Sequence, residues 1–359
     1  MQPFRADVLA ESPVRVGEKV AGIVANPASG RDIRRLVAQA SVFPTAEKAN
    51  MVQRLLAAFA VTGVDRALVS TDLGGISAAV LRALGRGGDW PTVEFCEADA
   101  LTGTAADTTN AVRRMVGEGA AVIVVLGGDG TARVAAAACD DVPLLALSTG
   151  TNNAFPQMRE ATVAGLAAGL IATGQVDPDL VTHRVSVLEV VTKARREIAL
   201  VDVCVTLSRH VGARAVWDPA SLTELYCTFA EPDGIGLSSV PGQLCPSPRS
   251  SPDGVALQLG PAAETPYVVH APIAPGLIRP VGVRGWGVLQ PGVRVDLAAA
   301  GGVIALDGER ELELKTGESA FVELRPDGPW CVDVRAVMAE AARRGLLRME
   351  TERGKERRR

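Results

Sequence analysis

Residues 121–138 read AVIVVLGGDGTARVAAAA, and this stretch decides the fold class. Its first six residues, Ala121 to Leu126, are apolar and four of them are β-branched, which predicts a buried β-strand. Gly127 to Thr131 interrupt the strand, and the alanine-rich residues 132–138 predict the start of a helix. A continuous apolar strand that turns directly into a helix is typical of a parallel sheet with helices on both faces.

The same alternation runs through the rest of the N-terminal half. Further strands are predicted at residues 21–26, 66–70, 92–96 and 144–147, and helices at residues 45–60, 76–84, 105–116 and 163–173. We therefore expect an N-terminal extension over residues 1–20 and an α/β nucleotide-binding domain over residues 21–178.

After Asp177-Pro178 the predicted secondary structure changes from alternating strands and helices to mainly strands and turns. Residues 183–191 and 197–207 alternate around a turn at 193–196, which predicts a β-hairpin. Strands are also predicted at 302–306, 311–314 and 319–324, with turns at Asp307-Gly308 and Thr316-Gly317. Residues 231–280 are dense in Pro, Gly and Ser, which predicts short strands and long loops over a site. A β-rich domain over residues 179–330 follows.

The last segment, residues 331–359, predicts a helix and a basic tail. Residues 333–344 place Val334, Val337, Met338 and Ala341 on one helical stripe, which we expect to pack back on the first domain. Arg353, Lys355 and the arginines 357–359 form a solvated tail in this interpretation.

Composition excludes several classes of protein. The formal net charge of −4 argues against a nucleic-acid partner. The longest apolar run, residues 120–126, is far below the ~20 residues that span a bilayer, and residues 1–14 lack the apolar stretch of a signal peptide. The six cysteines have no C-x-x-C spacing, and the three histidines lie far apart, so a zinc site is not expected. We expect a cytoplasmic protein without a membrane anchor.

Three polar loops follow predicted parallel strands, at residues 26–32, 127–131 and 148–156. All three are rich in Gly, Ser, Thr and Asn. Ligands of such sheets bind at the carboxyl ends of the strands. The coincidence of these loops therefore predicts the position of a binding site.

The loop from Gly127 to Thr131 suits phosphate. A strand that ends in Gly-Gly before a helix directs backbone N–H groups and the positive end of the helix dipole at one point. The glycines permit positive φ, and Thr131 is able to cap the helix or bind phosphate. Asp129 would hold Mg²⁺ or accept a proton from an attacking hydroxyl. The alternative is a plain strand-to-helix turn. The loop is neither a Walker A motif nor a G-x-G-x-x-G fingerprint.

A set of motifs resembles the NAD kinase and diacylglycerol kinase superfamily. The segments NPASG (26–30), GGDGT (127–131), GTNN (150–153) and LDGE (306–309) occur in the order typical of that superfamily. The fuller stretches GRDIRRLVAQASVFPTAEKANMVQRLL (30–56) and GTNNAFP (150–156) are similar to its AcoX-like branch, described as ATP-NAD kinase-like and often encoded beside acetoin catabolism genes. The resemblance covers residues 20–345.

The resemblance implies a parallel-sheet α/β domain, a β-sandwich-like domain and a site in the cleft between them. It implies nucleotide or phosphate contacts for Asn26, Ser29, Gly30, Gly127, Gly128, Gly130, Thr131, Gly150, Thr151, Asn152 and Asn153. It implies Mg²⁺ binding or acid–base chemistry for Asp129, and catalytic carboxylates at Asp307 and Glu309.

The implied activity is ATP-dependent phosphorylation of a hydroxyl on a soluble, cofactor-like acceptor, with Mg²⁺ and with NAD as the leading candidate. NAD kinases hold the NAD ribose with an acidic residue where this chain has Asn153, which weakens the case for NAD. The alternatives are a diacylglycerol-type lipid kinase and a non-catalytic nucleotide-binding accessory protein. Members of the superfamily are often homo-oligomers.

Some residues allow two interpretations. Arg31, Asp32, Arg34 and Arg133 either contact phosphate or lie on a solvated surface. Trp286 either stacks on a base or packs in the protein, and His270 is interpreted as a loop histidine. Asp307-Gly308 is also a typical hairpin turn.

Overall fold

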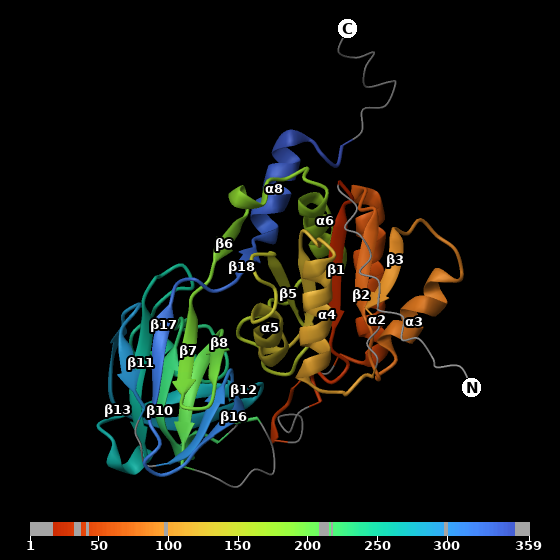
Figure 1. Cartoon of the computed structure of the whole chain (residues 1–359). Coiled ribbons are helices and arrows are strands. Elements are labelled where there is room, and N and C mark those ends of the chain that lie inside the picture. The colour runs from red at the N-terminus through yellow and green to blue at the C-terminus, as the bar shows by residue number, and fades with distance from the viewer. Residues whose placement is uncertain are drawn as a thin grey trace, which may run out of the picture.

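The structure is a computed structural model that describes residues 17–31, 37–40, 43–96, 100–207, 215–216, 218–297 and 301–348. Figure 1 shows two lobes, a helix-covered sheet and a body built of strands. The sheet of the first lobe has the order β3-β2-β1-β4-β5-β18-β6, and all neighbours are parallel except β6. Its strands are β1 (Val20–Ala25), β2 (Arg66–Ser70), β3 (Thr92–Cys96), β4 (Ile123–Gly127), β5 (Leu144–Ser148), β6 (Thr182–Arg184) and β18 (Trp330–Val332).

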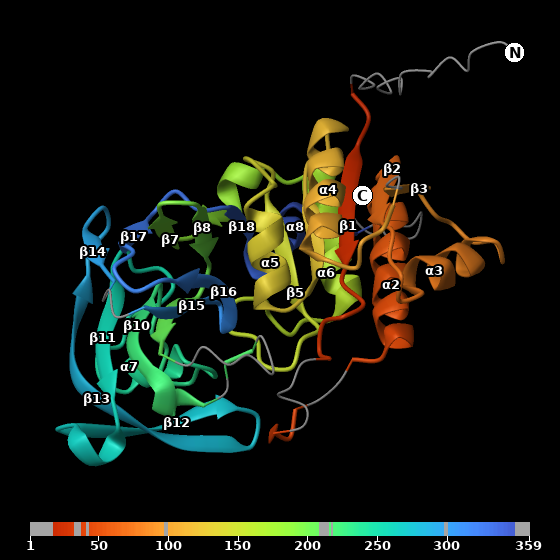
Figure 2. The same ribbon diagram turned by 60° about the horizontal axis from the view of Figure 1, so that its bottom comes forward.

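Helices cover both faces of this sheet (Figure 2). One apolar core lies under α2, α3, α6 and α8, and a second lies under α4 and α5. The helices are α2 (Thr45–Thr62), α3 (Ile76–Leu84), α4 (Ala105–Gly117), α5 (Asp129–Ala136), α6 (Ala161–Ala172) and α8 (Val334–Arg344). The predicted parallel sheet and its helices are confirmed. The predicted packing of α8 on the first lobe is confirmed as well, since Val334, Val337 and Ala341 belong to the first core.

Two strands of the first sheet, β6 and β18, come from the C-terminal half of the chain. β6 follows α6, and β18 lies shortly before α8, and the two pair with each other. β18 also lies parallel to β5. We propose that the chain divides into its α/β and β domains at these strands, so that both crossings between the domains occur at one edge of the first sheet.

The second lobe is a β-sandwich. A seven-stranded sheet of order β12-β13-β11-β10-β9-β15-β16 faces a four-stranded sheet of order β14-β17-β7-β8. Leu188, Val205, Ile304 and Val322 are among the buried residues between them. The strands are β7 (Val187–Thr192), β8 (Arg196–Ala199), β9 (Asp202–Thr206), β10 (Leu222–Cys227), β11 (Gly254–Gly260), β12 (Tyr267–Ala274), β13 (Leu277–Leu289), β14 (Arg294–Asp296), β15 (Gly302–Leu306), β16 (Glu309–Leu314) and β17 (Ala320–Arg325), with a short helix α7 (Ser239–Gly242). The predicted fold class is confirmed.

The predicted strand at 197–207 is wrong, because β8 and β9 are separate strands in different sheets. The backbone N–H groups of Leu200, Val201 and Asp202 donate to the carboxylate of Asp307 instead of to a neighbouring strand. The predicted strand at 183–191 likewise divides into β6 and β7. The hairpin around residues 193–196 is confirmed as β7–β8.

The prediction of short strands and long loops over residues 231–280 holds for its first part and is wrong for its second. Residues 231–253, all of which the structure describes, contain the short helix α7 and no named strand, whereas residues 254–280 contain β11, β12 and the start of β13, which is thirteen residues long. Pro272 lies in β12, an edge strand, where the register shifts between Pro272 and Ala274. A proline without an N–H group is tolerated at such a position, so its presence did not exclude a strand.

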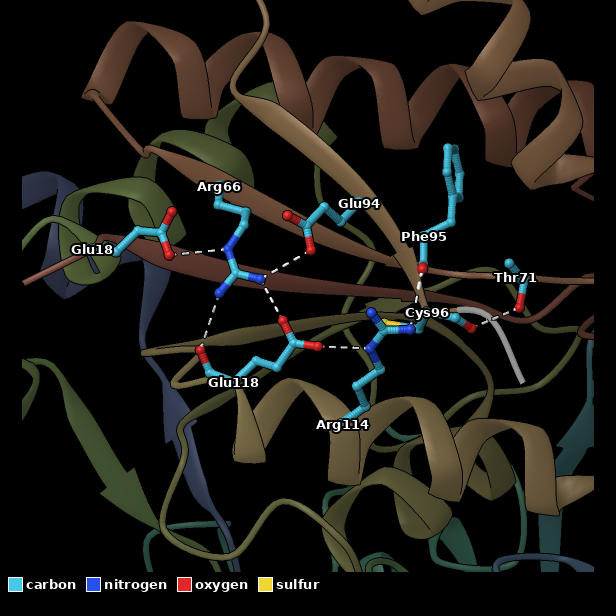
Figure 3. A network of polar contacts seen from close by, with 8 residues as sticks. All are labelled: Glu18, Arg66, Thr71, Glu94, Phe95, Cys96, Arg114 and Glu118. Atoms are coloured by element: carbon cyan, nitrogen blue, oxygen red, sulfur yellow. Dashed lines mark hydrogen bonds and ion pairs between the residues drawn. The ribbon is translucent and has the colours of Figure 1, made fainter. Parts of the chain in front are cut away.

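An ion-pair cluster joins the elements at one side of the first sheet (Figure 3). Arg66 of β2 is 8% exposed and binds Glu18, Glu94 and Glu118, while Arg114 of α4 also binds Glu118. No helix in the described part of the chain is long and apolar enough to cross a membrane.

Candidate active site

The three polar loops lie side by side because β1, β4 and β5 are adjacent parallel strands. Asn26 follows the last residue of β1, Gly127 ends β4, and Ser148 ends β5. Backbone hydrogen bonds join them, since the N–H of Asn26 donates to the carbonyl of Leu126 and that of Thr149 to the carbonyl of Gly127, both at 2.9 Å. The sheet therefore brings the predicted phosphate loops to one edge.

Side chains tie the loops to one another. The amide Nδ2 of Asn26 donates to Oγ1 of Thr131 at 2.8 Å, so the first loop contacts the start of α5. The hydroxyl of Ser29 lies 2.8 Å from the hydroxyl of Thr149 in the third loop. These contacts leave the three loops as one connected surface.

The GGDGT segment adopts a tight strand-to-helix turn. Gly128 caps α5 with an extended backbone, and Asp129 is its first residue. Neither Gly127 nor Gly128 uses the positive φ that glycine permits, and φ of Gly128 is −102°. The glycine at 127 has a steric reason instead, because a Cβ there would lie 2.4 Å from Cβ of Thr131.

Asp129 fastens the third loop to this turn. Its carboxylate accepts from the backbone N–H groups of Ala154 and Phe155 at distances of 2.8 to 3.1 Å. Phe155 itself is buried in the apolar cluster between the two domains. Asp129 thus contributes to the shape of the site through two backbone N–H groups, besides any contact with a ligand.

A cleft of about 890 Å³ opens over this edge of the sheet. It is lined by every residue that the resemblance implies for the site except Gly127 and Asn152. Asp72 and Thr104 from neighbouring loops also line it, and the second domain supplies Ala215, Asp307, Glu309 and Glu311. The candidate residues therefore line a cleft between the domains, which is where the resemblance places the site.

Asp307 is held at the back of the cleft. Its side chain is fully buried, and its backbone is left-handed with φ of 50°, beside Gly308 with φ of 70°. The predicted tight turn is confirmed. Burial raises the pKa of Asp307 to about 7, although Arg133 and the N–H groups of Val201 and Leu200 act in the opposite direction.

Glu309 reaches the start of α5 from the second domain. A Cβ placed on Gly130 would lie 3.2 Å from Oε1 of Glu309, so this carboxylate lies against the GGDGT turn. Figure 2 shows β16, which begins at Glu309, next to α5. No signal within residues 127–131 could have indicated this partner 179 positions further along the chain.

Arg133 is buried, contrary to the interpretation as a solvated helix residue. It is 7% exposed, donates to Glu311 at 2.8 Å and lies 3.7 Å from the carboxylate of Asp307. Sequence reasoning missed Glu311 as its partner. Arg133 lines the cleft and at the same time joins α5 to the second domain.

The two asparagines have different neighbours. Nδ2 of Asn152 donates to the carbonyl of Ile273 in β12 at 2.9 Å, which directs this amide to the second domain. Asn153 lines the cleft, where its Nδ2 donates to the hydroxyl of Ser148 at 2.7 Å and its Oδ1 lies against Gly128.

Of the remaining candidate residues that the structure describes, only Arg31 lines the cleft. Arg31 lines the cleft and donates to the hydroxyl of Thr45, whereas Asp32 and Arg34 lie outside the described residues. Trp286 packs edge-on against Tyr267 on the β12–β13 surface, with ring centroids 4.9 Å apart. Neither Trp286 nor His270 lines the cleft.

The donor set of the cleft suits a hard cation. Asp129, Glu309 and Glu311 offer carboxylate oxygens, which Mg²⁺ prefers. Among the described residues, no group of three or more His, Cys, Asp or Glu side chains is placed to hold a metal ion alone. Mg²⁺ commonly binds through one or two carboxylates plus the phosphates of a substrate, so the residues present fit that mode.

Comparisons with known proteins identify both domains. The family profile described as ATP-NAD kinase N-terminal domain matches residues 22–176, and the profile described as acetoin catabolism protein X C-terminal domain matches residues 186–327. The chain is 42% identical over 338 residues to acetoin catabolism protein X of Cupriavidus necator, which covers 92% of this chain and 94% of that relative. The chain belongs to the acetoin catabolism protein X family.

Membership of this family confirms the AcoX-like resemblance inferred from the motifs. The N-terminal domain, which carries the three polar loops, has a fold of the ATP-NAD kinase type. A solved NAD kinase from Archaeoglobus fulgidus in complex with ATP aligns with 79% of this chain and 98% of its own, at 13% identity and a TM-score of 0.36.

Proposed function

We propose that this protein is an ATP-dependent kinase that transfers a phosphoryl group to a hydroxyl of a soluble, cofactor-like acceptor. The supporting observation is that three phosphate-type loops and the carboxylates of a second domain line a single cleft. Its volume of about 890 Å³ lies in the range of small-molecule sites. NAD is the first acceptor to test, because the first domain is of the ATP-NAD kinase type.

The loops of the first domain would hold the phosphates. The start of α5 supplies backbone N–H groups and the positive end of its dipole, and Gly128 and Gly130 allow phosphate oxygens to approach the main chain. Ser29, Gly30 and Thr151 line the same cleft from the neighbouring loops.

Mg²⁺ would be held by Asp129 together with the phosphates, and would neutralise their charge. The cleft carries six carboxylates, at Asp72, Asp107, Asp129, Asp307, Glu309 and Glu311, against the described cations Arg31 and Arg133. Such a lining disfavours a free polyphosphate and favours one whose charge a divalent cation has reduced.

Glu309 is the proposed general base. It lies against the phosphate turn and enters the cleft from the opposite domain, where a hydroxyl acceptor would approach. Asp307 is fully buried and accepts from three backbone N–H groups. We therefore assign Asp307 to positioning the turn that carries Glu309, and Asp129 to positioning the third loop as well as to the metal.

The test is an ATP-dependent phosphorylation assay on a panel of acceptors: NAD, NADH, nucleosides, thiamine-type cofactors and diacylglycerol. We expect turnover of one soluble acceptor. The variant Glu309→Gln should lose at least about 100-fold in kcat, because the base is removed, while MgATP still raises the melting temperature. Glu313→Gln is the matched control, since Glu313 is an exposed carboxylate on the same strand.

Other results would identify another function. Turnover of diacylglycerol alone would indicate the lipid kinase. MgATP binding without turnover of any acceptor would indicate a nucleotide-binding accessory protein. The kinase proposal is refuted if no nucleotide shifts the melting temperature of the folded protein.

A further inference from the structure

Lys48 is a buried lysine that the proposed chemistry does not use. It lies in the first turn of α2, its residue is 1% exposed, and it is among the largest fully buried side chains of the described chain. Removing an ammonium group from water is strongly unfavourable unless hydrogen bonds replace its hydration. A lysine at this depth therefore requires specific partners.

Those partners are three carbonyl groups of the first polar loop. Nζ of Lys48 donates to the backbone oxygens of Asn26 at 3.0 Å, Pro27 at 3.2 Å and Ser29 at 2.7 Å. An ammonium group has three N–H donors, so each donor has one acceptor. The side chain has no donor left for a ligand, which excludes direct contact with phosphate in this arrangement.

The contact sets the orientation of the loop. With three carbonyl oxygens directed at α2, their partial negative charge lies on the side of Lys48. A carbonyl directed into the cleft would instead repel phosphate. The loop is completed by hydrogen bonds from the N–H groups of Ala28, Ser29 and Arg31, and by the left-handed Gly30 with φ of 76°.

The Asn26–Gly30 loop contacts the other two polar loops directly. Asn26 donates to Thr131 in the GGDGT turn, and Ser29 contacts Thr149 in the third loop. A Cβ on Gly30 would lie 3.1 Å from the carbonyl oxygen of Thr149, so the loops also touch closely. Lys48 thus lies behind the surface that the three loops form.

We propose that Lys48 is a positioning residue that holds the Asn26–Gly30 loop in the conformation that binds nucleotide phosphate. The proposal rests on the proposed function, because it assigns the loop to phosphate.

The protonation state of Lys48 adds a pH dependence. Burial lowers the pKa of Lys48 to about 8, and Arg31 acts in the same direction, whereas Asp72 opposes it. Arg31 and Asp72 are the charged groups that act on it among the described residues. A neutral amine has two N–H donors for three carbonyls, so the loop loses one hydrogen bond as the pH rises past this value.

The first test compares two variants of α2. Lys48→Met removes the donors and keeps a long unbranched side chain, and Arg54→Met removes a partly exposed cation of the same helix. At pH 7 we expect the amides of residue 26 and residues 28–31 in ligand-free Lys48→Met to lose about tenfold or more in hydrogen-exchange protection, and the Kd of MgATP to rise about tenfold. Arg54→Met should change neither.

Unchanged protection of these amides in folded Lys48→Met overturns the proposal. If that variant does not fold, a pH series of the wild type decides. Protection and MgATP affinity should fall from about pH 7 to about pH 9.5, and Lys48→Arg should remove this dependence, because arginine stays protonated. A flat wild-type profile overturns the proposal. If the wild type does not bind MgATP, the proposed function fails, while the exchange measurement still decides the role of Lys48.

Discussion

Asp307 shows how one side chain sets the local structure of two distant segments. It begins the turn between β15 and β16, and its carboxylate accepts hydrogen bonds from the N–H groups of Leu200, Val201 and Asp202, which would otherwise continue a strand. Burial, partly opposed by Arg133, raises its pKa from 3.8 to about 7. The folded protein therefore binds this proton more tightly than the unfolded chain does.

This shift predicts a pH dependence of stability with a definite sign. Between about pH 4 and about pH 7 the native state holds the proton of Asp307 and the unfolded state has released it, so the free energy of unfolding falls as the pH rises through this window. We expect Asp307→Asn to remove this contribution. Relative to the wild type, the variant should gain stability from about pH 4.5 to about pH 7 in urea unfolding and show a constant difference above that.

Asp327→Asn serves as the control for Asp307. The hydrogen bond from Arg325 lowers the pKa of Asp327, so this carboxylate is ionised in both states above about pH 5. Its substitution should therefore change stability by a constant amount across the same range. A constant difference for Asp307→Asn as well would contradict the assignment.

Among the elements, the first sheet depends on a charged cluster as well as on its apolar core. The guanidinium of Arg66, on β2, meets carboxylates from residue 18, from β3 and from the end of α4 (Figure 3). Burial alone would raise the pKa of Glu118, but hydrogen bonds from Arg114 and Arg66 lower it below its usual value. The ion pairs of Glu118 with Arg66 and Arg114 therefore stabilise the fold as long as Glu118 is ionised.

Arg66→Met should lower the free energy of unfolding by about 3 kcal/mol at pH 7, because it leaves partly buried carboxylates without their partner. The effect should shrink in acid: a carboxylate with a lowered pKa contributes its stability above its unfolded pKa and loses it as the pH falls through the folded value. Chemical denaturation at pH 7 and pH 4 measures both. Arg294→Met is the control, because the Arg294–Glu323 pair is exposed at its arginine and should contribute less than about 1 kcal/mol.

The elements of the first domain could be predicted from the sequence because their signals are local. Apolar runs and helical spacing located β2, α3 and β3 with their observed bounds, since buried parallel strands need no partner information to be identified. The break between β8 and β9 could not be predicted, because it depends on the carboxylate of Asp307, more than 100 positions away.

The parts of the site likewise differ in whether local sequence signals or contacts between distant residues determine them. The three loops could be placed together because carboxyl ends of parallel strands share an edge. The roles of Lys48, Glu311 and Arg249 depend on contacts between segments far apart in sequence or on different domains, for which the sequence has no periodic signal. The assignments of the individual site residues to phosphate, metal or proton transfer remain predictions.

For the whole molecule, the position of the second domain is coupled to the shape of the site. Arg249 of the second domain donates to the carbonyl oxygens of Ala154 and Phe155 in the third loop, pairs with Glu231 and stacks over the ring of Phe229. The N–H groups of the same two loop residues donate to Asp129. One short stretch of backbone is therefore held from both sides, by Asp129 of the GGDGT turn and by Arg249 of the opposite domain.

Arg249→Met should therefore weaken nucleotide binding, although Arg249 does not line the cleft. We expect MgATP to bind several-fold more weakly, because the loop that Asp129 contacts loses its support, and we expect the thermal unfolding transition to broaden as the domains lose a contact between them. Calorimetric titration and differential scanning calorimetry measure the two effects. Arg184→Met is the control, since Arg184 also stacks on an aromatic ring, that of Trp330, but has its ion pair with the exposed Asp141, away from the cleft. If Arg249→Met weakens MgATP binding no more than Arg184→Met does, the third loop keeps its shape without the second domain, and the two domains act on the nucleotide independently.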